Sequence, residues 1–509
     1  MAFRHGVYIS EEPTPTLPPV RVPSAMPVAF VTAPVHLARD PYAVTHVPQL
    51  CFVNREAVSA FGFSLRPEIW NNYTACEMIF SQFSLYAVSP IVIVNVLDPN
   101  IHNEVVTNKR LNLRGFSAVL ADEDTSEAEP VRVPTEGVLI DTVTVSNTEG
   151  RVYEAGVHYT LAFNRDGHVV ITALESVIGG ISENEQLEFG YTKLAPEKVD
   201  ILDYIGGYDV QTGKNFGMEI VNDIFPRFRL VPGSILAPGV SGNPVLAAVM
   251  ETRASNINGH FRCAALLDVP TMIENAHSEL VHHLYTDIPT WKNQNNFVFD
   301  AQFNGYPKLR LNDLIFNYST QLAGLIGLTD NDNSQTPYVS PSNKNLMING
   351  ICYEDGEEMI LNVEQANYLN GNGIMTAINF TNGWVAWGNR TGAYPGNTDP
   401  KDSFIPIRRM FIWIGNAIVL TYWRKIDFPL TMRTIETIVD SINIWLNGLA
   451  AREFILGGRV EFLQDDNPHT DIIDGIAKFR LRIAPPPPLE EAEFILQYDP
   501  EYLSNLFAS

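Results

Sequence analysis

A serine in the stretch "PGVSGNP" is the first candidate for chemistry, because nucleophilic serines often occupy a sharp turn between a strand and a helix. That turn needs a glycine two residues after the serine, and Asn243 stands at this position after Ser241. The sequence shows no recognisable serine–histidine–aspartate set. We therefore expect Ser241 to belong to a structural loop.

Histidines cluster in the stretch "HSELVHH", which contains His277, His282 and His283. Metal-binding histidines on one helix are three or four residues apart, because that spacing places them on the same face. His282 and His283 follow His277 by five and six residues, so this spacing does not predict a metal site.

Oxygen-bearing side chains alternate in "TDNDNSQ" (329–335), as they do in calcium-binding loops. The stretch lacks the central glycine and the closing glutamate of the helix-loop-helix calcium site, so we expect a polar surface turn. No glycine-rich phosphate-binding loop with a lysine occurs, which argues against nucleotide hydrolysis. The sequence therefore predicts no enzyme activity, no cofactor and no metal site.

The composition describes a large globular protein that is strongly acidic. A chain of 509 residues exceeds one ordinary core, so roughly two to four domains are expected. Hydrophobic residues make up 45% and charged residues 18%, which excludes a disordered chain. The net charge of −24 argues against general nucleic-acid binding, since that affinity depends on Lys and Arg at the phosphates.

Cysteine usage and apolar segments bear on the compartment. The four cysteines, which show no paired spacing, predict buried free thiols: Cys51, Cys76, Cys263 and Cys352. The opening "MAFRHGVYIS" lacks the pattern of a signal peptide. The most apolar segment, 411–423, is too short to span a bilayer. We expect that the chain does not insert into a membrane. We also expect that it assembles in a cytoplasm-like compartment.

Hydrophobic periodicity predicts an α/β core that is interrupted by an all-β segment. The run "SPIVIVNVL" (89–97) indicates a strand buried on both faces. Residues 235–270 indicate a strand, a helix that begins near Asn243-Pro244, and another buried strand, which favours a parallel sheet. Segment 98–200 has 18 acidic and 8 basic residues, a net charge of −10, and its alternating runs predict an inserted β-sandwich with a hairpin turn at "NRDG" (164–167).

The C-terminal hundred residues combine a long helix with a short hairpin. Apolar side chains at helical spacing run from Ile435 to Leu449, and we expect Gly457 and Gly458 to close this helix. A two-stranded hairpin should follow, and an isolated hairpin is marginally stable with two unpaired edges. It is predicted at Arg459, Val460, Glu461, Phe462 and Leu463, and at Lys478, Phe479, Arg480, Leu481, Arg482 and Ile483.

Both ends of the chain read as extended arms. Prolines 485–488 hold a semi-rigid spacer of about 12 Å, which prevents a tight turn back to the hairpin. The strand that follows the prolines is predicted at Glu491, Ala492, Glu493, Phe494, Ile495, Leu496, Gln497 and Tyr498. A short strand also precedes the proline-rich N-terminal stretch, at Gly6, Val7, Tyr8, Ile9 and Ser10.

The stretch "GWVAWGNRTGAYPGNTDPKDSFIPIRRMFIWI" (383–414) contains a Trp-Gly-x-Arg-Thr motif and an Arg-Arg pair that opens an apolar helix. Four further stretches accompany it: "HGVYISEEP" (5–13), "AGLIGLTDNDNSQTPYVSPSN" (323–343), "NYLNGNGI" (367–374) and "LNGLAAREFILGGRVEF" (446–462). Together these five stretches, and above all 383–414 and 446–462, resemble the contractile tail sheath proteins of bacteriophages and related contractile injection systems. The resemblance covers nearly the whole chain.

The resemblance implies a fold of α/β and β domains. It consists of a non-catalytic subtilisin-like α/β core with an inserted β-sandwich, an α+β C-terminal domain, and extended N- and C-terminal arms. The expected divisions are an N-terminal arm at 1–27, a core at 28–97 and 201–400, an outward-facing insert at 98–200, a tube-proximal domain at 401–484 and a C-terminal arm at 485–509.

The function implied by the resemblance is that of a structural subunit. Hexameric rings would stack helically around a rigid inner tube, and contraction would drive the tube through an envelope without nucleotide hydrolysis. Partners would be further copies of the chain, the inner tube protein, and terminator or neck and baseplate proteins, in a virion tail assembled in the bacterial cytoplasm. Phage tails, bacteriocins and toxin-delivering particles all fit the motifs equally.

Within that function, we hypothesise that each arm strand pairs with the hairpin of a neighbouring subunit, giving a four-stranded sheet from three chains. Segment 401–433 has six basic and two acidic residues, and an acidic tube surface would complement it. Arg424, Lys425 and Arg433 are the candidate tube contacts, whereas Arg408 and Arg409 could equally form internal ion pairs.

Two other functions compete with the sheath interpretation. A receptor-binding adhesin would use the β-rich insert 98–200, and glycan binding by that segment would support it. A degenerate subtilisin-like protease would need a serine near a histidine and an aspartate, and peptidase activity would support it.

Overall fold

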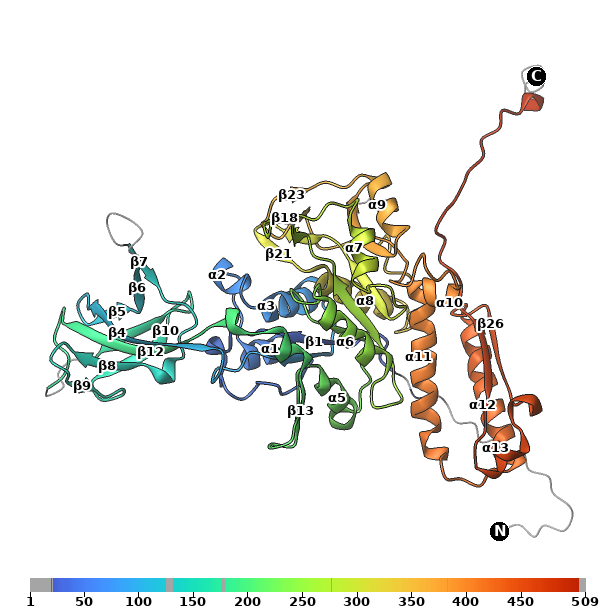
Figure 1. The fold of residues 1–509 in the computed structure, drawn as a ribbon, viewed down its shortest axis with the longest axis horizontal. Helices are drawn as coiled ribbons and strands as arrows, with labels where there is room; N and C mark the ends of the chain where they lie inside the picture. The colour runs from blue at the N-terminus through green and yellow to red at the C-terminus, as the bar shows by residue number, and fades with distance from the viewer. Residues whose placement is uncertain are drawn as a thin grey trace, which may run out of the picture.

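The computed structural model describes residues 20, 22–124, 131–174, 179–275, 277–381 and 383–502, and it shows a mixed α/β protein with several sheets (Figure 1). The molecule is elongated. A β-rich unit lies at one end of its long axis, the α/β core lies in the middle, and a pair of long helices lies at the other end. The predicted mixture of α/β and β architecture is confirmed at this level.

An eight-stranded sheet forms the centre of the core. Its six middle strands are parallel, and an antiparallel strand closes each edge. The strands predicted at 89–97 and after residue 260 are present as β3 and β16, side by side with others of the same sheet. In sheet order the strands are β2 (Gln49–Cys51), β3 (Ile91–Asn95), β1 (Pro27–Val31), β15 (Ser234–Leu236), β16 (Ala264–Asp268), β19 (Gln302–Gly305), β24 (Ile374–Asn379) and β25 (Trp384–Trp387).

Helices cover both faces of this sheet, which explains its unbroken apolar strands. In β1, Val28 and Phe30 face one buried cluster, whereas Ala29 and Val31 face the other. The predicted cap at Asn243 is confirmed, because its side chain accepts hydrogen bonds from the first turn of α6 at 2.9 and 3.4 Å. The covering helices are α1 (Asn54–Phe61), α3 (Thr74–Ile79) and α8 (Tyr318–Asp332) on one face, and α5 (Val221–Phe228) and α6 (Pro244–Ser255) on the other.

Smaller elements surround the sheet. The short helices are η1 (Val35–Leu37), α2 (Pro67–Trp70), η2 (Phe80–Leu85), η4 (Pro196–Lys198), α4 (Ile201–Ile205), η5 (Gly217–Ile220), α7 (Ile288–Gln294) and α9 (Val363–Asn370). The peripheral strands are β13 (Gly207–Asp209) with β14 (Lys214–Phe216), β17 (Met272–Glu274) with β18 (Leu280–His282), and β20 (Lys308–Leu311), β21 (Leu314–Phe316), β22 (Gly350–Cys352) and β23 (Glu358–Met359).

The β-rich unit has its own apolar core, which is separate from that of the α/β sheet. The predicted turn "NRDG" (164–167) joins β10 to β11, and the backbone N–H of Asn164 donates to His168 at 2.9 Å. The strands are β4 (Asn103–Asn112), β12 (Gln186–Leu194), β8 (Thr144–Asn147) and β9 (Val152–Tyr153), then β10 (Tyr159–Phe163), β11 (Val169–Ala173) and β5 (Ser117–Val119), and β6 (Ala121–Asp124) with β7 (Val131–Pro134); one short helix, η3 (Ile140–Thr142), precedes β8.

The C-terminal region places a hairpin against two long helices. The helix does not end at Gly457 and Gly458 as expected: it ends at Ala451, and the two glycines begin a strand. The hairpin strands are correspondingly shifted from the predicted bounds, so Phe462, Leu463, Lys478 and Phe479 lie just outside them. The elements are α10 (Pro400–Ser403), α11 (Ile405–Tyr422), η6 (Trp423–Lys425), α12 (Met432–Ala451), β26 (Gly457–Glu461), η7 (Gln464–Asp466), α13 (His469–Ile473) and β27 (Arg480–Ala484).

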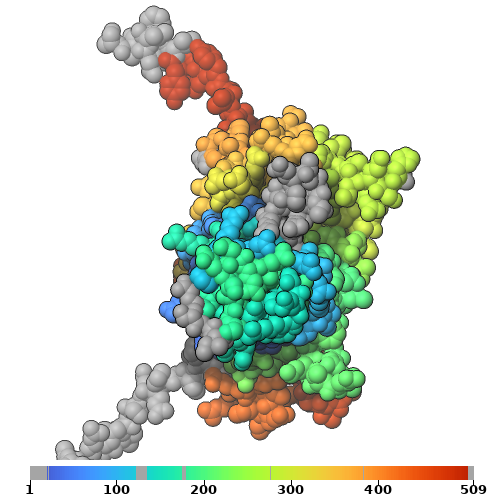
Figure 2. Space-filling model, turned by 90° about the vertical axis from the view of Figure 1, so that its left-hand side faces the viewer, coloured from blue at the N-terminus to red at the C-terminus, as the bar shows by residue number. Residues whose placement is uncertain are grey.

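Beyond β27 the chain first passes along the core and then leaves the body of the molecule as an extended segment (Figures 1 and 2). The predicted strand 491–498 makes no backbone hydrogen bond with any other described residue. The predicted N-terminal strand 6–10 lies outside the described residues.

Candidate assembly sites

The serine that resembled a nucleophile is part of a buried structural cross-link. Ser241 donates to the carboxylate of Asp268 at 3.0 Å, and the backbone N–H and hydroxyl of Ser319 donate to the same carboxylate at 2.8 and 2.6 Å. Burial raises the pKa of Asp268. No histidine hydrogen-bonds to Ser241 or Asp268 in the part of the chain that the structure describes. The prediction of a structural loop is confirmed.

The three histidines of "HSELVHH" do not converge. His283 is buried and its Nδ1 lies 2.8 Å from the carbonyl oxygen of Pro270, whereas His277 is exposed. His282 instead faces Asp355, which comes from a distant turn.

The expectation of a surface turn at 329–335 was wrong for the first half of that stretch. Residues 329–332 form the last turn of α8, and Asp330 is 2% exposed. The charge of Asp330 can be buried because Arg409 pairs with it at 2.5 Å. The helix therefore continues through residues whose composition suggested a loop.

The arginine pair that opens α11 is engaged inside the molecule. Arg408 pairs with Asp300 at 2.6 Å and with Asp402 at 3.5 Å, and both arginines are buried. Of the two interpretations left open by the sequence, internal ion pairs are confirmed. Much of the positive charge of segment 401–433 is thus neutralised within the subunit, and Lys401 also pairs with Asp402, at 2.6 Å.

Three residues that precede β1, Val20, Val22 and Ser24, are held along α11 and are called the N-terminal root below. The backbone N–H of Val20 donates to Thr421 at 3.0 Å, and the indole of Trp413 donates to the carbonyl of Val22 at 3.0 Å. Ser24 donates to Asp330 at 2.5 Å, beside the Arg409 guanidinium. The chain that precedes β1 therefore follows α11 and reaches the last turn of this helix at Val20.

The C-terminal segment is held through Glu490, called the C-terminal root below, near the start of α11. Arg390, from the Trp-Gly-x-Arg-Thr motif, donates through Nε and Nη2 to the two carboxylate oxygens of Glu490 at 2.9 and 2.5 Å. Its guanidinium lies 3.7 Å from the ring centre of Phe404 and 4.3 Å from that of Tyr394, and it also donates to Ser403 at 3.2 Å. A bidentate, stacked arginine of this kind fixes both position and orientation.

The four prolines span the gap between two fixed points. At one end, the backbone N–H of Leu456 donates to Ala484 at 2.7 Å, which fixes the end of β27. At the other end, residues 488–491 line a groove of about 620 Å³ in the surface of the core, beside the Arg390–Glu490 pair. The spacer therefore connects the hairpin to the core, and the free part of the arm begins after Glu490.

The free part of the arm carries large apolar side chains in water. Phe494 is 86% exposed and Leu496 is 95% exposed, and Ile495 and Tyr498 are similarly exposed. Phe494, Leu496 and Tyr498 alternate with Ile495 and Gln497, so a β-conformation would place the first three on one face. Figure 2 shows the C-terminal segment, in red, projecting beyond the body of the molecule.

The hairpin has one apolar face, one charged face and incompletely paired edges. Val460, with Leu481 and Ile483, packs into the cluster beneath α12. On the other face Arg459 pairs with Glu461 at 2.9 Å, and this hydrogen bond lowers the pKa of Glu461. The sheet contains only β26 and β27 among the described residues.

The two edges of the hairpin differ in what already covers them. The side chain of Asn443, on α12, accepts from the backbone N–H of Val460 at 2.8 Å and donates to its carbonyl at 3.3 Å. Part of β26 is therefore satisfied within the subunit. No side chain of a described residue forms such a bridge to the backbone of β27.

The predicted tube contacts lie in and just after the loop between α11 and α12. Arg424 and Arg433 are exposed and neither forms an ion pair with a described residue, whereas the ammonium of Lys425 lies 4.9 Å from the ring centre of Phe428. Exposed apolar side chains surround these cations: Trp423, Ile426, Phe428, Leu430 and Met432. This set, Trp423 to Arg433, is called the basic loop below.

The motifs of the 383–414 stretch were recognisable in the sequence, but the residues with which their arginines pair were not. Arg390 and Glu490 are 100 residues apart, and Arg409 and Asp330 are 79 residues apart. Sequence reasoning could locate the arginines within the 383–414 stretch, but spacing alone gave no signal for their partners. The four cysteines are free and buried as predicted, and no described helix has the length and apolarity to cross a bilayer.

Comparison with known proteins supports the resemblance found in the motifs. No family model matches the chain. The tail sheath protein of Burkholderia phage BcepMu is 24% identical over 522 aligned residues, which cover 99% of this chain and 98% of the relative.

Two solved structures of the anti-feeding prophage share the fold. The contracted helical sheath gives a TM-score of 0.51 at 14% identity and covers 97% of this chain and 98% of the other. A chain of the six-fold symmetrised baseplate gives a TM-score of 0.52, also at 14% identity, over 98% of this chain and all of the other. The likeness extends along the whole chain.

Proposed function

We propose that this chain, a homologue of contractile tail sheath proteins, is the structural subunit of a contractile sheath in a virion tail or a related injection particle. Full-length similarity to the phage sheath protein is the observation that carries this proposal. The subunit polymerises with further copies of itself in stacked hexameric rings around a rigid tube. Contraction then drives the tube through the target envelope, as the release of a metastable arrangement of packed subunits.

Strand donation by the C-terminal arm links the subunits. The exposed apolar side chains of 491–498 support this. Burying each of them against a neighbouring copy would stabilise the assembly by about 1.5–3 kcal/mol of free energy. Adding a strand also pairs backbone groups that a two-stranded hairpin leaves open. We assign the acceptor edge to β27, because Asn443 already occupies part of β26. The N-terminal strand 6–10 would be donated to another neighbour.

Three contacts hold the chain where the arms leave the subunit. Arg409 holds Ser24 through Asp330 near the start of α11, Thr421 holds Val20 at its end, and Arg390 holds Glu490. The N-terminal root reaches the end of α11 and the C-terminal root lies near its start, about 27 Å away for 18 helical residues. Fixed roots reduce the ordering cost of strand addition and leave bending to the segments beyond them.

The orientation of the subunit follows from its long axis. The β-rich unit and the C-terminal helices lie at opposite ends (Figure 1), so a C-terminal domain that faces the tube would place the β-rich unit on the outside. The basic loop would then contact an acidic tube surface, and the apolar side chains around Arg424, Lys425 and Arg433 would add contact area. Terminator or neck and baseplate proteins would cap the polymer.

The core serves as a scaffold in this proposal. Its parallel sheet with helices on both faces supports a subtilisin-like arrangement without catalysis, because Ser241 is buried and bonded to Asp268. Assembly would take place in the cytoplasm of the host bacterium, before export or cell lysis.

Negative-stain electron microscopy of the expressed chain tests the proposal. The chain, alone or with its tube protein, should form hollow tubes with a regular cross-striation. A chain that remains monomeric with its tube protein present, at concentrations well above those of assembly, would contradict a sheath function.

A further inference from the structure

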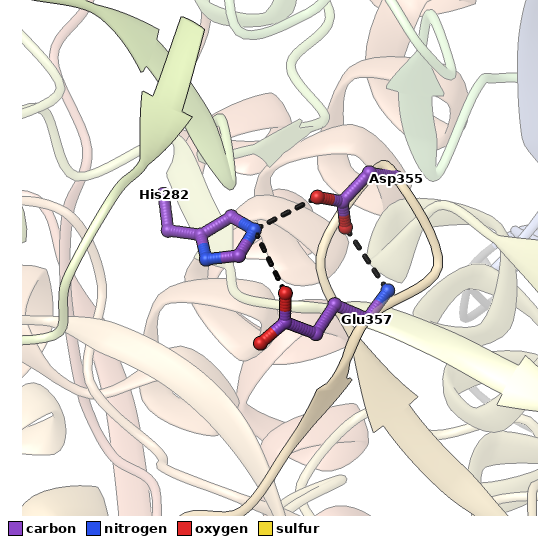
Figure 3. A group of neighbouring side chains, drawn as sticks. All are labelled: His282, Asp355 and Glu357. Atoms are coloured by element: carbon purple, nitrogen blue, oxygen red, sulfur yellow. Dashed lines mark hydrogen bonds and ion pairs between the residues drawn. The ribbon is translucent and has the colours of Figure 1, made fainter.

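Three side chains from two distant segments converge on one point at the surface of the core (Figure 3). His282 lies at the end of β18, and Asp355 and Glu357 lie in the turn between β22 and β23. The Nε2 atom of His282 is 2.8 Å from Oδ2 of Asp355 and 3.8 Å from Oε2 of Glu357. This cluster is separate from the arm roots, the hairpin and the basic loop.

We propose that His282, Asp355 and Glu357 form a surface binding site for a divalent transition-metal ion, with Zn²⁺ as the preferred ion. Bonds from zinc to imidazole nitrogen and carboxylate oxygen are about 2.0–2.2 Å, so two ligands of a tetrahedral ion lie roughly 3.4 Å apart. The observed separations of 2.8 and 3.8 Å lie on either side of that value, and all three ligand atoms lie within 4.8 Å of one another. Water would complete the coordination.

The histidine and the aspartate are already oriented for this role. The His282 ring stacks on Tyr353 with ring centres 3.9 Å apart and an interplanar angle of 10°, which fixes the direction of Nε2. The backbone N–H of Glu357 donates to Oδ1 of Asp355 at 3.0 Å, which leaves Oδ2 to face the histidine. Such supporting contacts orient metal ligands and strengthen binding.

A simple ion pair accounts for only part of this arrangement. One imidazole can satisfy one carboxylate, yet two carboxylates face the same nitrogen. Two basic residues next to this turn pair with other carboxylates: Lys308 with Glu354 and Arg310 with Glu358, each at 3.6 Å. A divalent ion would neutralise both facing carboxylates together.

The donor set indicates the class of ion. One imidazole with two carboxylates suits Zn²⁺ and its neighbours in the first transition row, whereas Mg²⁺ and Ca²⁺ prefer sites made of oxygen alone. A bound ion would join the β17–β18 hairpin to the β22–β23 turn, which belong to different sheets. This site does not depend on the sheath function.

Calorimetric titration of ZnCl₂ into the untagged full-length chain tests the site. We expect saturable binding of one Zn²⁺ that excess Mg²⁺ does not compete away. His282→Ala should weaken this binding at least tenfold, and His277→Ala, an exposed histidine of the same hairpin, should leave it unchanged. Absence of saturable Zn²⁺ binding by the unmodified chain would overturn the proposal, as would an equal loss in the two histidine variants.

Glu357→Gln separates a metal site from a structural ion pair. This variant keeps the shorter contact between His282 and Asp355, so the unfolding temperature without metal should not change. Zn²⁺ should raise the unfolding temperature of the unmodified chain and raise that of Glu357→Gln much less. An equal Zn²⁺-dependent rise in both proteins would show that Glu357 is not a ligand and would overturn the three-residue site.

Discussion

The core sheet and the C-terminal hairpin are both β-structure, but they are completed in different ways. In the core, β2 and β25 close the edges of eight strands, and helices bury both faces. Among the described residues the hairpin has two strands, and the apolar segment 491–498 that follows it is exposed. One region is complete in a single copy, whereas the other exposes the groups that a second copy could cover.

Under the proposed strand donation, a subunit would stay intact while its contacts rearrange. Contacts between rigid faces would separate when subunits move, whereas strands donated between copies would keep those copies linked. The Arg390–Glu490 pair marks where the self-contained part of the chain ends, because the chain is held against the core up to Glu490 and is exposed beyond it.

Removal of residues 489–509 should have the largest effect on assembly. The truncated chain should remain folded and soluble, because the described part of this segment, 489–502, makes no backbone hydrogen bond to the core, but it should not polymerise. Sedimentation and negative-stain microscopy would measure this. If the truncated protein forms tubes of normal length, the claim that assembly depends on residues 489–509 is contradicted.

Asp330→Asn should produce the opposite pattern, a loss of stability in the core. It leaves the buried Arg409 guanidinium without its carboxylate, and breaking a buried pair costs about 3–5 kcal/mol. Urea unfolding would measure this, with Asp440→Asn on the exposed surface of α12 as the control, for which a change within about 0.5 kcal/mol is expected. Equal stability of the two variants would contradict the structural role of the Arg409–Asp330 pair.

Glu490→Gln should weaken assembly without abolishing it. The variant loses the charge in the bidentate pair with Arg390, so the arm should leave the subunit in a wider range of directions. Because Glu490 is partly exposed, subunit stability should fall by no more than about 1 kcal/mol. The concentration needed for tube formation should rise several-fold. The matched control is Glu364→Gln on the exposed surface of α9, which lies outside the arm and whose carboxylate has no ion-pair partner among the described residues; an equal rise in that variant would contradict the anchor.

Arg433→Glu should have the smallest effect, and only when the tube protein is present. Reversing an exposed charge in the basic loop should reduce co-assembly with an acidic tube, more strongly at low salt, and leave self-assembly unchanged. Arg227→Glu, on the exposed surface of α5, makes the same charge change outside the basic loop. Pull-down of tube protein would compare them, and equal retention would remove Arg433 from the tube contacts.

Local patterns in the sequence were enough for the main elements. The β-branched run at 89–97 predicted a buried strand, Asn243-Pro244 predicted the start of α6, and "NRDG" predicted a hairpin turn, because each signal is contained in a few neighbouring residues. The hairpin after α12 was also predicted, within two residues of its observed bounds.

Features that depend on distant partners were not predictable. The stretch 329–332 has the polar composition of a loop, but it is helical because Arg409 neutralises Asp330. Gly457 and Gly458 have the composition of a helix end, but they form a strand because they pair with β27. The anchor on Glu490 likewise needs Arg390, which folding alone brings close.

A reconstruction of the assembled sheath by cryo-electron microscopy, at a resolution that traces side chains, would show directly where the C-terminal arm binds. Residues 491–498 are expected as a β-strand beside β27 of an adjacent copy, with Glu490 still paired with Arg390 of its own copy. A strand 491–498 paired with the hairpin of its own copy, or in contact with no other copy, would contradict it.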